Sequence, residues 1–275
     1  MPRATMVNLR LRWPFLAAAA VVLIGAAILL LWQTVGTTRD RVWEHIQSTG
    51  QWRVGMDASF PPFQDLDEAG RPVGFDVDLA EAIAAYWGVE AQIEGLGFDG
   101  LVDAVQAGRI DSAISALPYQ PERTQDVAFS DAYFEAGLVL VIPAGSASVA
   151  SLNDLAGRRL AVEWGSEGDV QARLLRRRFP DLSLLPGDTP QAALLAVAVD
   201  QADAALVDRV SALQFIAGNS TVQISPQVVV SDPYVIVMPR KAPVLQAKVG
   251  EALQALQADG TLDALIARWF GIPSR

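Results

Sequence analysis

The 275-residue chain is 51% hydrophobic and carries a formal net charge of −10. That composition supports a large buried core without disulfides or metals, and it excludes disorder for the chain as a whole. Residues 1–38 contain three arginines and no acid, so the remainder carries −13; an acidic globule of this kind repels nucleic acid and anionic lipid.

Cysteine is absent, and histidine occurs once, at His45. Without cysteine the chain has no disulfide framework, thiolate metal site or lipidated cysteine anchor. With a single histidine, the commonest general base and zinc ligand is missing from the motifs described below. We therefore expect no metal and no cofactor, and any catalysis would have to use carboxylates.

The first predicted element is a membrane helix. Residues 14–32 are apolar over 19 positions, about the length that a helix needs to cross roughly 30 Å of hydrocarbon. The arginines before them predict a cytoplasmic N-terminus over residues 1–12 and export of everything from about residue 40 onward. We expect a single-pass transmembrane anchor at 13–35, and a cleaved signal peptide is the alternative.

The exported part alternates between short strands and helices. A polar helix over 39–50 is expected within a spacer, residues 36–51, and Asp76 and Asp99 are predicted to cap the next two helices. The remaining predictions are helices over 76–87, 100–107, 168–179, 190–199, 244–257 and 261–270 and strands over 52–56, 110–115, 159–164 and 203–207. This alternation predicts an α/β fold with mainly parallel sheets, long enough for two lobes.

Seven segments follow one another along the exported part: DASFPPF at 57–63, GFDVDLA at 74–80, GFDGLVDAVQAGRIDSAIS at 97–115, PERTQDVAFSDAYF at 121–134, LAGRRLAVEWGSEG at 155–168, VDQADAALVD at 199–208 and ADGTLDALIARWFG at 258–271. In this order they resemble the polar-amino-acid-binding family of periplasmic or extracellular solute-binding proteins of ABC transporters (type II, bacterial family 3). The resemblance covers residues 52–271, and seven matches in the correct order carry far more weight than one.

The resemblance implies a two-lobe clamp that the chain crosses twice. Lobe 1 is expected over 52–137 and 235–272 and lobe 2 over 138–234, with hinges at 137–142 and 233–238. It also implies that a monomer captures an amino acid or a related small charged solute between the lobes. The protein is expected at the extracytoplasmic face of the bacterial cell membrane, or released to the periplasm or outside if the signal is cleaved, and its expected partner is an ABC-transporter permease.

Two charged residues match the family positions that bind the ends of an amino acid. Arg123 matches the arginine that holds the carboxylate, a role that suits its planar guanidinium; the alternative is a surface ion pair with Glu122 or Asp126. Asp208 matches the aspartate that holds the ammonium, and it is also placed to cap the helix that follows.

Other predicted ligand-binding residues come from the loops after the strands. Phe60 and Phe98 match positions that wall the side chain of the ligand, with ordinary core packing as the alternative. Asp57 either faces the crevice or bonds to backbone in its own turn. Ser166 and Glu167 match a loop at a helix start whose amides and hydroxyls hold the carboxylate.

The sequence departs from the family pattern in three places. The segment SALPYQPER supplies Ser115 and Ala116 to the site, but it places Pro118, which has no N–H, where the family often offers an amide and a hydroxyl. Glu167 replaces a small hydroxyl residue, so either it faces away or the solute has a second cationic group. Trp164 either enlarges the pocket or packs beneath the loop.

Two other functions are compatible with the sequence. The clamp can serve as a ligand sensor that acts with a separate signalling chain. Relatives of this fold also resemble dehydratases and lyases, for which the pair Glu163 and Glu167 would supply acid and base. Because fold analogy alone carries little weight, we expect a binding protein and no enzyme.

Overall fold

The computed structural model describes residues 40–146, 149 and 151–271. The anchor or signal peptide predicted at 13–35 and the predicted cytoplasmic segment, 1–12, lie outside these residues. Within the described ranges, no helix is both long enough and apolar enough to cross a membrane.

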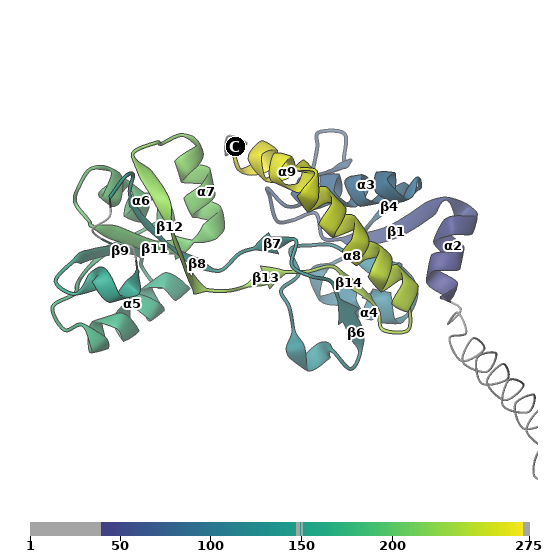
Figure 1. Cartoon of the computed structure of the whole chain (residues 1–275), viewed down its shortest axis with the longest axis horizontal. Coiled ribbons are helices and arrows are strands. Elements are labelled where there is room, and N and C mark those ends of the chain that lie inside the picture. Colours follow the sequence, from purple (N-terminus) through teal and green to yellow (C-terminus); the bar gives the residue numbers. More distant parts are fainter. Residues whose placement is uncertain (1–39, 147–148, 150, 272–275) are drawn as a thin grey trace, which may run out of the picture. The chain divides into compact units, whose positions relative to one another are not determined.

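Two five-stranded sheets organise residues 40–271 (Figure 1). The first sheet has the order β4 (Glu90–Gly95), β1 (Gln51–Met56), β5 (Ser112–Ala113), β14 (Val237–Pro239) and β6 (Val127–Phe129). The second sheet has the order β10 (Ser183–Gly187), β9 (Arg159–Glu163), β11 (Ala204–Asp208), β8 (Leu138–Pro143) and β12 (Val222–Val230). Each is thus a separate sheet with its own strand order.

In each sheet one strand runs against the other four. In the first sheet, β14 is antiparallel to β5 and β6, while β1 is parallel to β4 and β5. In the second sheet, β8 is antiparallel to β11 and β12, while β9 is parallel to β10 and β11. Both reversed strands follow directly on a crossing between the sheets, so the expected parallel arrangement holds except where the chain changes sheet.

The crossing itself is a short antiparallel ladder of β7 (Phe134–Glu135) and β13 (Pro233–Tyr234). Most of the expected hinge at 137–142 belongs to β8, and β14 begins at Val237 within the other expected hinge. Short apolar runs are as typical of buried strands as of hinges, so the pattern could not separate the two.

Helices cover the sheets. With the first sheet lie α2 (Arg41–Thr49), α3 (Phe75–Trp87), α4 (Leu101–Gln106), α8 (Pro243–Ala258) and α9 (Thr261–Phe270). With the second lie α5 (Glu167–Arg178), α6 (Pro190–Ala198) and α7 (Arg209–Ala217), and α7 also contacts α9. Shorter elements are the hairpin β2 (Asp65–Leu66) and β3 (Pro72–Val73) and the 3-10 turns η2 (Phe98–Gly100), η3 (Pro121–Arg123) and η4 (Leu152–Leu155).

The caps predicted at Asp76 and Asp99 are wrong. Helix α3 begins after Gly74, and α4 begins after η2; neither start has a side-chain cap. Gly74 has φ of 140°, and a Cβ there would lie 2.1 Å from the carbonyl oxygen of Phe63. This close approach needs glycine, and it carries Asp76 past the cap position into the interior.

An aromatic cluster fills the first-sheet core beside the crossing strands. The ring of Phe63, fully buried, lies 5.1 Å from that of Phe134 and 5.3 Å from those of Tyr234 and Phe270, measured between centroids. Edge-on and tilted pairs of this kind add to the free energy of burial. The cluster therefore ties the crossing strands β7 and β13 to α9.

Candidate functional site

The predicted site residues lie where parallel strands end. Asp57 directly follows β1, Ser115 comes two residues after β5, Ser166 follows β9, and Asp208 is the last residue of β11. The carboxyl ends of parallel strands are where open α/β sheets hold ligands, because loops and helix N-termini meet there.

A first-sheet cavity of about 290 Å³ collects six of the predicted residues. It is lined by Asp57, Phe60, Phe98, Ser115, Ala116 and Pro118, together with Ser59, Gln64, Asp232 and Tyr234, which sequence analysis did not select. Phe60 and Phe98 are 49% and 42% exposed, so they are not ordinary core residues.

A second cavity of about 470 Å³, called here the crossing cavity, is lined by residues associated with both sheets. Phe60 lines it from the first-sheet side, and Ser166, Glu167 and Asp208 line it from the second-sheet side. Phe60, Asp232 and Tyr234 line both cavities. The two cavities therefore adjoin at these three side chains.

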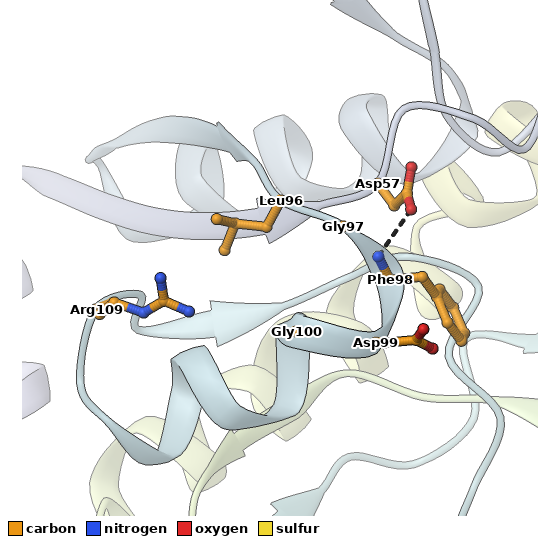
Figure 2. Close-up of a pocket in the computed structure, with 7 residues that line it drawn as sticks. All are labelled: Asp57, Leu96, Gly97, Phe98, Asp99, Gly100 and Arg109. Carbon is orange, nitrogen blue, oxygen red and sulfur yellow. Dashed lines mark hydrogen bonds between the residues drawn. The ribbon is translucent and has the colours of Figure 1, made fainter.

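Asp57 fixes the loop that carries Phe98. Its Oδ2 accepts a hydrogen bond from the backbone N–H of Phe98 at 2.8 Å, which Figure 2 shows. Its own N–H donates to Oγ of Ser115 at 3.0 Å. Both Asp57 and Phe98 also line a neighbouring cavity of about 530 Å³ around residues 96–100 (Figure 2). Asp57 thus hydrogen-bonds to backbone, as one of its two predicted roles stated. The partner, however, lies in the loop that carries Phe98 and not in the turn at 57–63.

Beneath the first-sheet cavity lies a buried hydrogen-bond network centred on Asp76. Its Oδ2 accepts hydrogen bonds from the backbone N–H of Ala116 at 2.7 Å, from the Tyr133 hydroxyl at 3.1 Å and from Nε2 of Gln64. Burial raises the pKa of Asp76 to about 7, although all three hydrogen bonds act in the opposite direction. Burial, followed by the charge of Asp76, raises the pKa of Tyr133 well above its ordinary value.

Sequence reasoning missed this network. One feature of the sequence could have indicated it: Asp76 lies between two apolar residues, Phe75 and Val77, within a helical pattern. An aspartate flanked in this way is either a cap or a buried group, and the cap was chosen. The network also engages the Ala116 amide, which the resemblance had placed in the ligand site.

The second-sheet side of the crossing cavity is organised by helix caps. The Ser166 hydroxyl accepts a hydrogen bond from the N–H of Asp169 at 3.2 Å and donates to the carbonyl oxygen of Glu163 at 2.8 Å, capping α5. Oδ1 of Asp208 accepts from the N–H of Ser211 at 2.8 Å, capping α7 as expected. Both helix N-termini thus meet at the crossing cavity.

Acidic groups gather where the cavities adjoin. Burial and then the charge of Glu135 raise the pKa of Asp232. Burial and then the charges of Asp232, Asp76 and Asp208 raise the pKa of Tyr234 to about 12. Asp232 was not selected from the sequence, because it lies in a stretch that looked like the approach to a hinge strand.

Arg123 lines neither cavity. Its guanidinium lies 3.4 Å from the carboxylate of Asp103 and 3.6 Å from that of Asp126, the second being a partner that the surface alternative named. The proposed contact of Arg123 with a ligand carboxylate stays a prediction.

Trp164 also lies outside both cavities. It is 65% exposed, so it does not pack beneath its loop, and the Arg173 guanidinium lies 5.1 Å from the centre of its ring. Arg173 is in turn paired with Asp169 at 2.8 Å. The contact of Trp164 with a ligand stays a prediction.

The part of the chain that the structure describes contains no group of three or more histidine, cysteine, aspartate or glutamate residues arranged to hold a metal ion. The described residues that line the two cavities supply carboxylates, hydroxyls, backbone amides, aromatic rings, the side-chain amides of Gln64 and Gln214 and one arginine, Arg209.

Comparison with known proteins agrees with this geometry. The chain is 27% identical over 228 residues to the L-cystine-binding protein TcyJ of Escherichia coli K12, covering 82% of this chain and 85% of TcyJ. It is 26% identical over 222 residues to ABC transporter arginine-binding protein 1 of the same organism, covering 78% of this chain and 89% of the relative.

Among solved structures, the unliganded open form of the L-cystine solute receptor of Neisseria gonorrhoeae superimposes with a TM-score of 0.71 at 26% identity, covering 85% of this chain and 97% of that one. The mixed α/β fold is thus the type II periplasmic-binding-protein fold. Residues 52–272 match the family described as bacterial extracellular solute-binding proteins, family 3, and the chain belongs to that family.

Proposed function

We propose that this protein captures an amino acid or a related small charged solute outside the cytoplasm and passes it to an ABC transporter. The observation that carries the proposal is the pair of adjoining cavities, which share Phe60, Asp232 and Tyr234 and draw their lining from both sheets. The relatives support the solute class, since one is an L-cystine-binding protein and another is the arginine-binding protein of an ABC transporter.

We further propose that residues 52–137 with 235–272 and residues 138–234 act as two lobes that close on the solute about the ladder of β7 and β13. Closure removes water from charged groups, and a buried charge without a partner is costly. Each charged group of the solute therefore requires a polar partner in the site. Asp208 is the proposed partner for a positively charged group.

Solute binding is tested by calorimetry and thermal denaturation with the twenty amino acids, polyamines and small organic acids. A ligand that binds only the folded protein stabilises it by about 2.7 kcal/mol at one hundred times its Kd. At least one solute of these classes is expected to raise the Tm. A flat response to the whole panel would contradict the proposal.

The variant Asp208→Asn separates binding from capping. Asparagine caps helices about as well as aspartate, so the free energy of unfolding without ligand should change by less than about 0.5 kcal/mol. Loss of the charge should weaken solute binding tenfold or more, about 1.4 kcal/mol. The matched control is Asp200→Asn, on a side chain that is 95% exposed and lines neither cavity. Equal affinity in both variants would remove Asp208 from the site.

The protein is proposed to release its solute unchanged. This is supported by the relatives, which are named as binding proteins, one of them of an ABC transporter. Mass spectrometry of the bound solute after prolonged incubation checks this. A changed mass would favour the enzyme alternative.

The segment at 13–35 is proposed to direct export, either as a retained anchor or as a cleaved signal. The intact mass of the protein recovered from cells distinguishes the two, because cleavage removes the apolar segment and retention keeps it.

A further inference from the structure

Residues 115–118, called here the site loop, contain a backbone conformation that is rare for their residue types. Ser115, Ala116 and Pro118 of this loop line the first-sheet cavity. Ala116 has φ of 46°, in the left-handed region that favours glycine and costs free energy for a residue with a Cβ. Such a conformation persists only where the surrounding structure holds it. This part of the cavity wall therefore depends on the contacts that fix the backbone of Ala116.

Two buried side chains hold the N–H of Ala116. It donates to Oδ2 of Asp76 at 2.7 Å and to the hydroxyl oxygen of Tyr133 at 3.1 Å. The Tyr133 hydroxyl in turn donates to the same Asp76 oxygen at 3.1 Å. Asp76 and Tyr133 are 0% and 2% exposed, and they line neither the first-sheet cavity nor the crossing cavity. They can therefore influence a solute only through the residues that they hold.

The same carboxylate also holds the turn that carries Phe60. Nε2 of Gln64 donates to Oδ2 of Asp76. The backbone of Gln64 is paired with that of Phe60 by two hydrogen bonds, of 3.0 Å and 3.1 Å, one in each direction. Phe60 lines both cavities. One buried oxygen thus connects two parts of the lining that are far apart in the sequence.

The residues on either side of Ala116 are attached to the crossing strand β13 and its continuation. The N–H of Val235 donates to the carbonyl oxygen of Leu117 at 2.9 Å, and the N–H of Tyr119 donates to that of Pro233 at 3.0 Å. These bonds do not involve Asp76. Without the Asp76 carboxylate the loop would therefore stay attached to the crossing strand, while its strained residue would be free to change conformation.

We propose that Asp76 is a positioning residue of the solute site, which fixes Ala116 in the left-handed conformation and Gln64 beside Phe60 before the solute arrives. Positioning of this kind increases affinity, because a loop that must become ordered on binding reduces the free energy that binding releases. The inference rests on the proposed solute-binding function, and it adds to that function a residue that the solute does not touch.

Affinity is measured by calorimetry on the full chain, with the compound of the panel that stabilises the wild type most. Asp76→Ala removes the common acceptor of the three hydrogen bonds and should raise the Kd about tenfold or more, because the loop must then order on binding. Asp76→Asn keeps an oxygen acceptor and should bind nearly as tightly as the wild type. Wild-type affinity in Asp76→Ala would overturn the proposal. So would equally weak binding by Asp76→Asn and Asp76→Ala.

The matched control is Asp40→Ala. Asp40 is a second buried aspartate packed with the first sheet, 3% exposed, whose carboxylate accepts backbone hydrogen bonds from the first turns of α2 and α8. It lines neither cavity. Its loss should lower the Tm and leave the Kd unchanged. Equal increases of the Kd in Asp40→Ala and Asp76→Ala would mean that affinity merely follows stability, which contradicts a positioning role.

Tyr133→Phe is the second variant, for use if Asp76→Ala does not fold. It removes only a hydroxyl, so the ring still fills its place in the core. The Ala116 N–H loses one of its two acceptors, and the Kd should rise severalfold. An unchanged Kd would overturn the role assigned to this network.

Hydrogen–deuterium exchange of the unliganded protein tests the positioning without any solute. The segment 112–119 should exchange faster in Asp76→Ala and Tyr133→Phe than in the wild type and Asp40→Ala, because the Ala116 N–H has lost an acceptor. Unchanged exchange of this segment overturns the inference while solute binding stands. If no compound of the panel binds the wild type, the proposed function falls, and the exchange result still decides whether Asp76 holds the site loop.

Discussion

The two sides of the site are built in different ways. On the first-sheet side, Gln64, Asp76 and Tyr133 form a network that is almost fully buried and joins segments far apart in the chain. On the second-sheet side, Ser166 and Asp208 are helix caps whose bonds reach only three residues along the chain. The first side depends on long-range packing, and the second depends on local structure.

This difference predicts different consequences of mutation. Removing a buried partner leaves an unsatisfied polar group or a void, so changes on the first-sheet side should alter the stability of the fold. Changes on the second-sheet side should alter binding and cost little stability, because caps are worth about 1 kcal/mol.

The largest expected effect is at Phe63. Phe63→Ala should lower the free energy of unfolding by about 3–5 kcal/mol, because the ring is fully buried and its loss leaves a cavity among aromatic neighbours. Phe60→Ala is the matched control: its ring stacks on Phe63 at 5.6 Å but is 49% exposed. Urea denaturation of both variants measures the difference. Similar losses in the two would mean that burial does not distinguish these positions.

The next effect is the pH dependence that Asp76 imposes. Burial raises its pKa from 3.8 to about 7 in the folded protein. A raised carboxyl pKa contributes stability that is present below about pH 4 and is lost as the pH rises through about 7. Asp76→Asn retains an oxygen acceptor and cannot ionise, so it should remove this loss, which is on the order of 4 kcal/mol at most.

Thermal denaturation of the wild type and Asp76→Asn between pH 4 and pH 8 gives the comparison. The stability of the wild type should fall relative to the variant across that range and level off above it. Parallel curves would mean that Asp76 is ionised throughout and that its network is not closed to water.

The smallest effect is at Ser166. Ser166→Ala removes the cap of α5 and should lower the free energy of unfolding by about 1 kcal/mol. Thr189→Ala, at the cap of α6, is the control outside the cavities and should cost the same. A loss near 3 kcal/mol at Ser166 alone would show that the second-sheet side is as tightly packed as the first.

Local patterns were sufficient for most elements. Helix α9 spans Thr261–Phe270 as predicted, and Thr189 caps α6 with Pro190 in its first turn. The same patterns failed at Asp76 and Asp99, because a carboxylate ahead of a helical pattern has the same appearance whether it caps the helix or not. For Asp76, the packing of Gly74 against Phe63 decided that the carboxylate is buried and does not cap α3.

The sequence by itself determined the alternation of strands and helices, the family resemblance and the loops at the strand ends that line the candidate site. Each depends on periodicity or on neighbours within a few residues. Only the tertiary structure brought Asp232 and Tyr234 beside Phe60, and only it buried Gln64 with Asp76. Those contacts depend on how the chain crosses between the two sheets. The burial that raises the pKa values of Asp76, Asp232 and Tyr234 exists only once these segments have packed together.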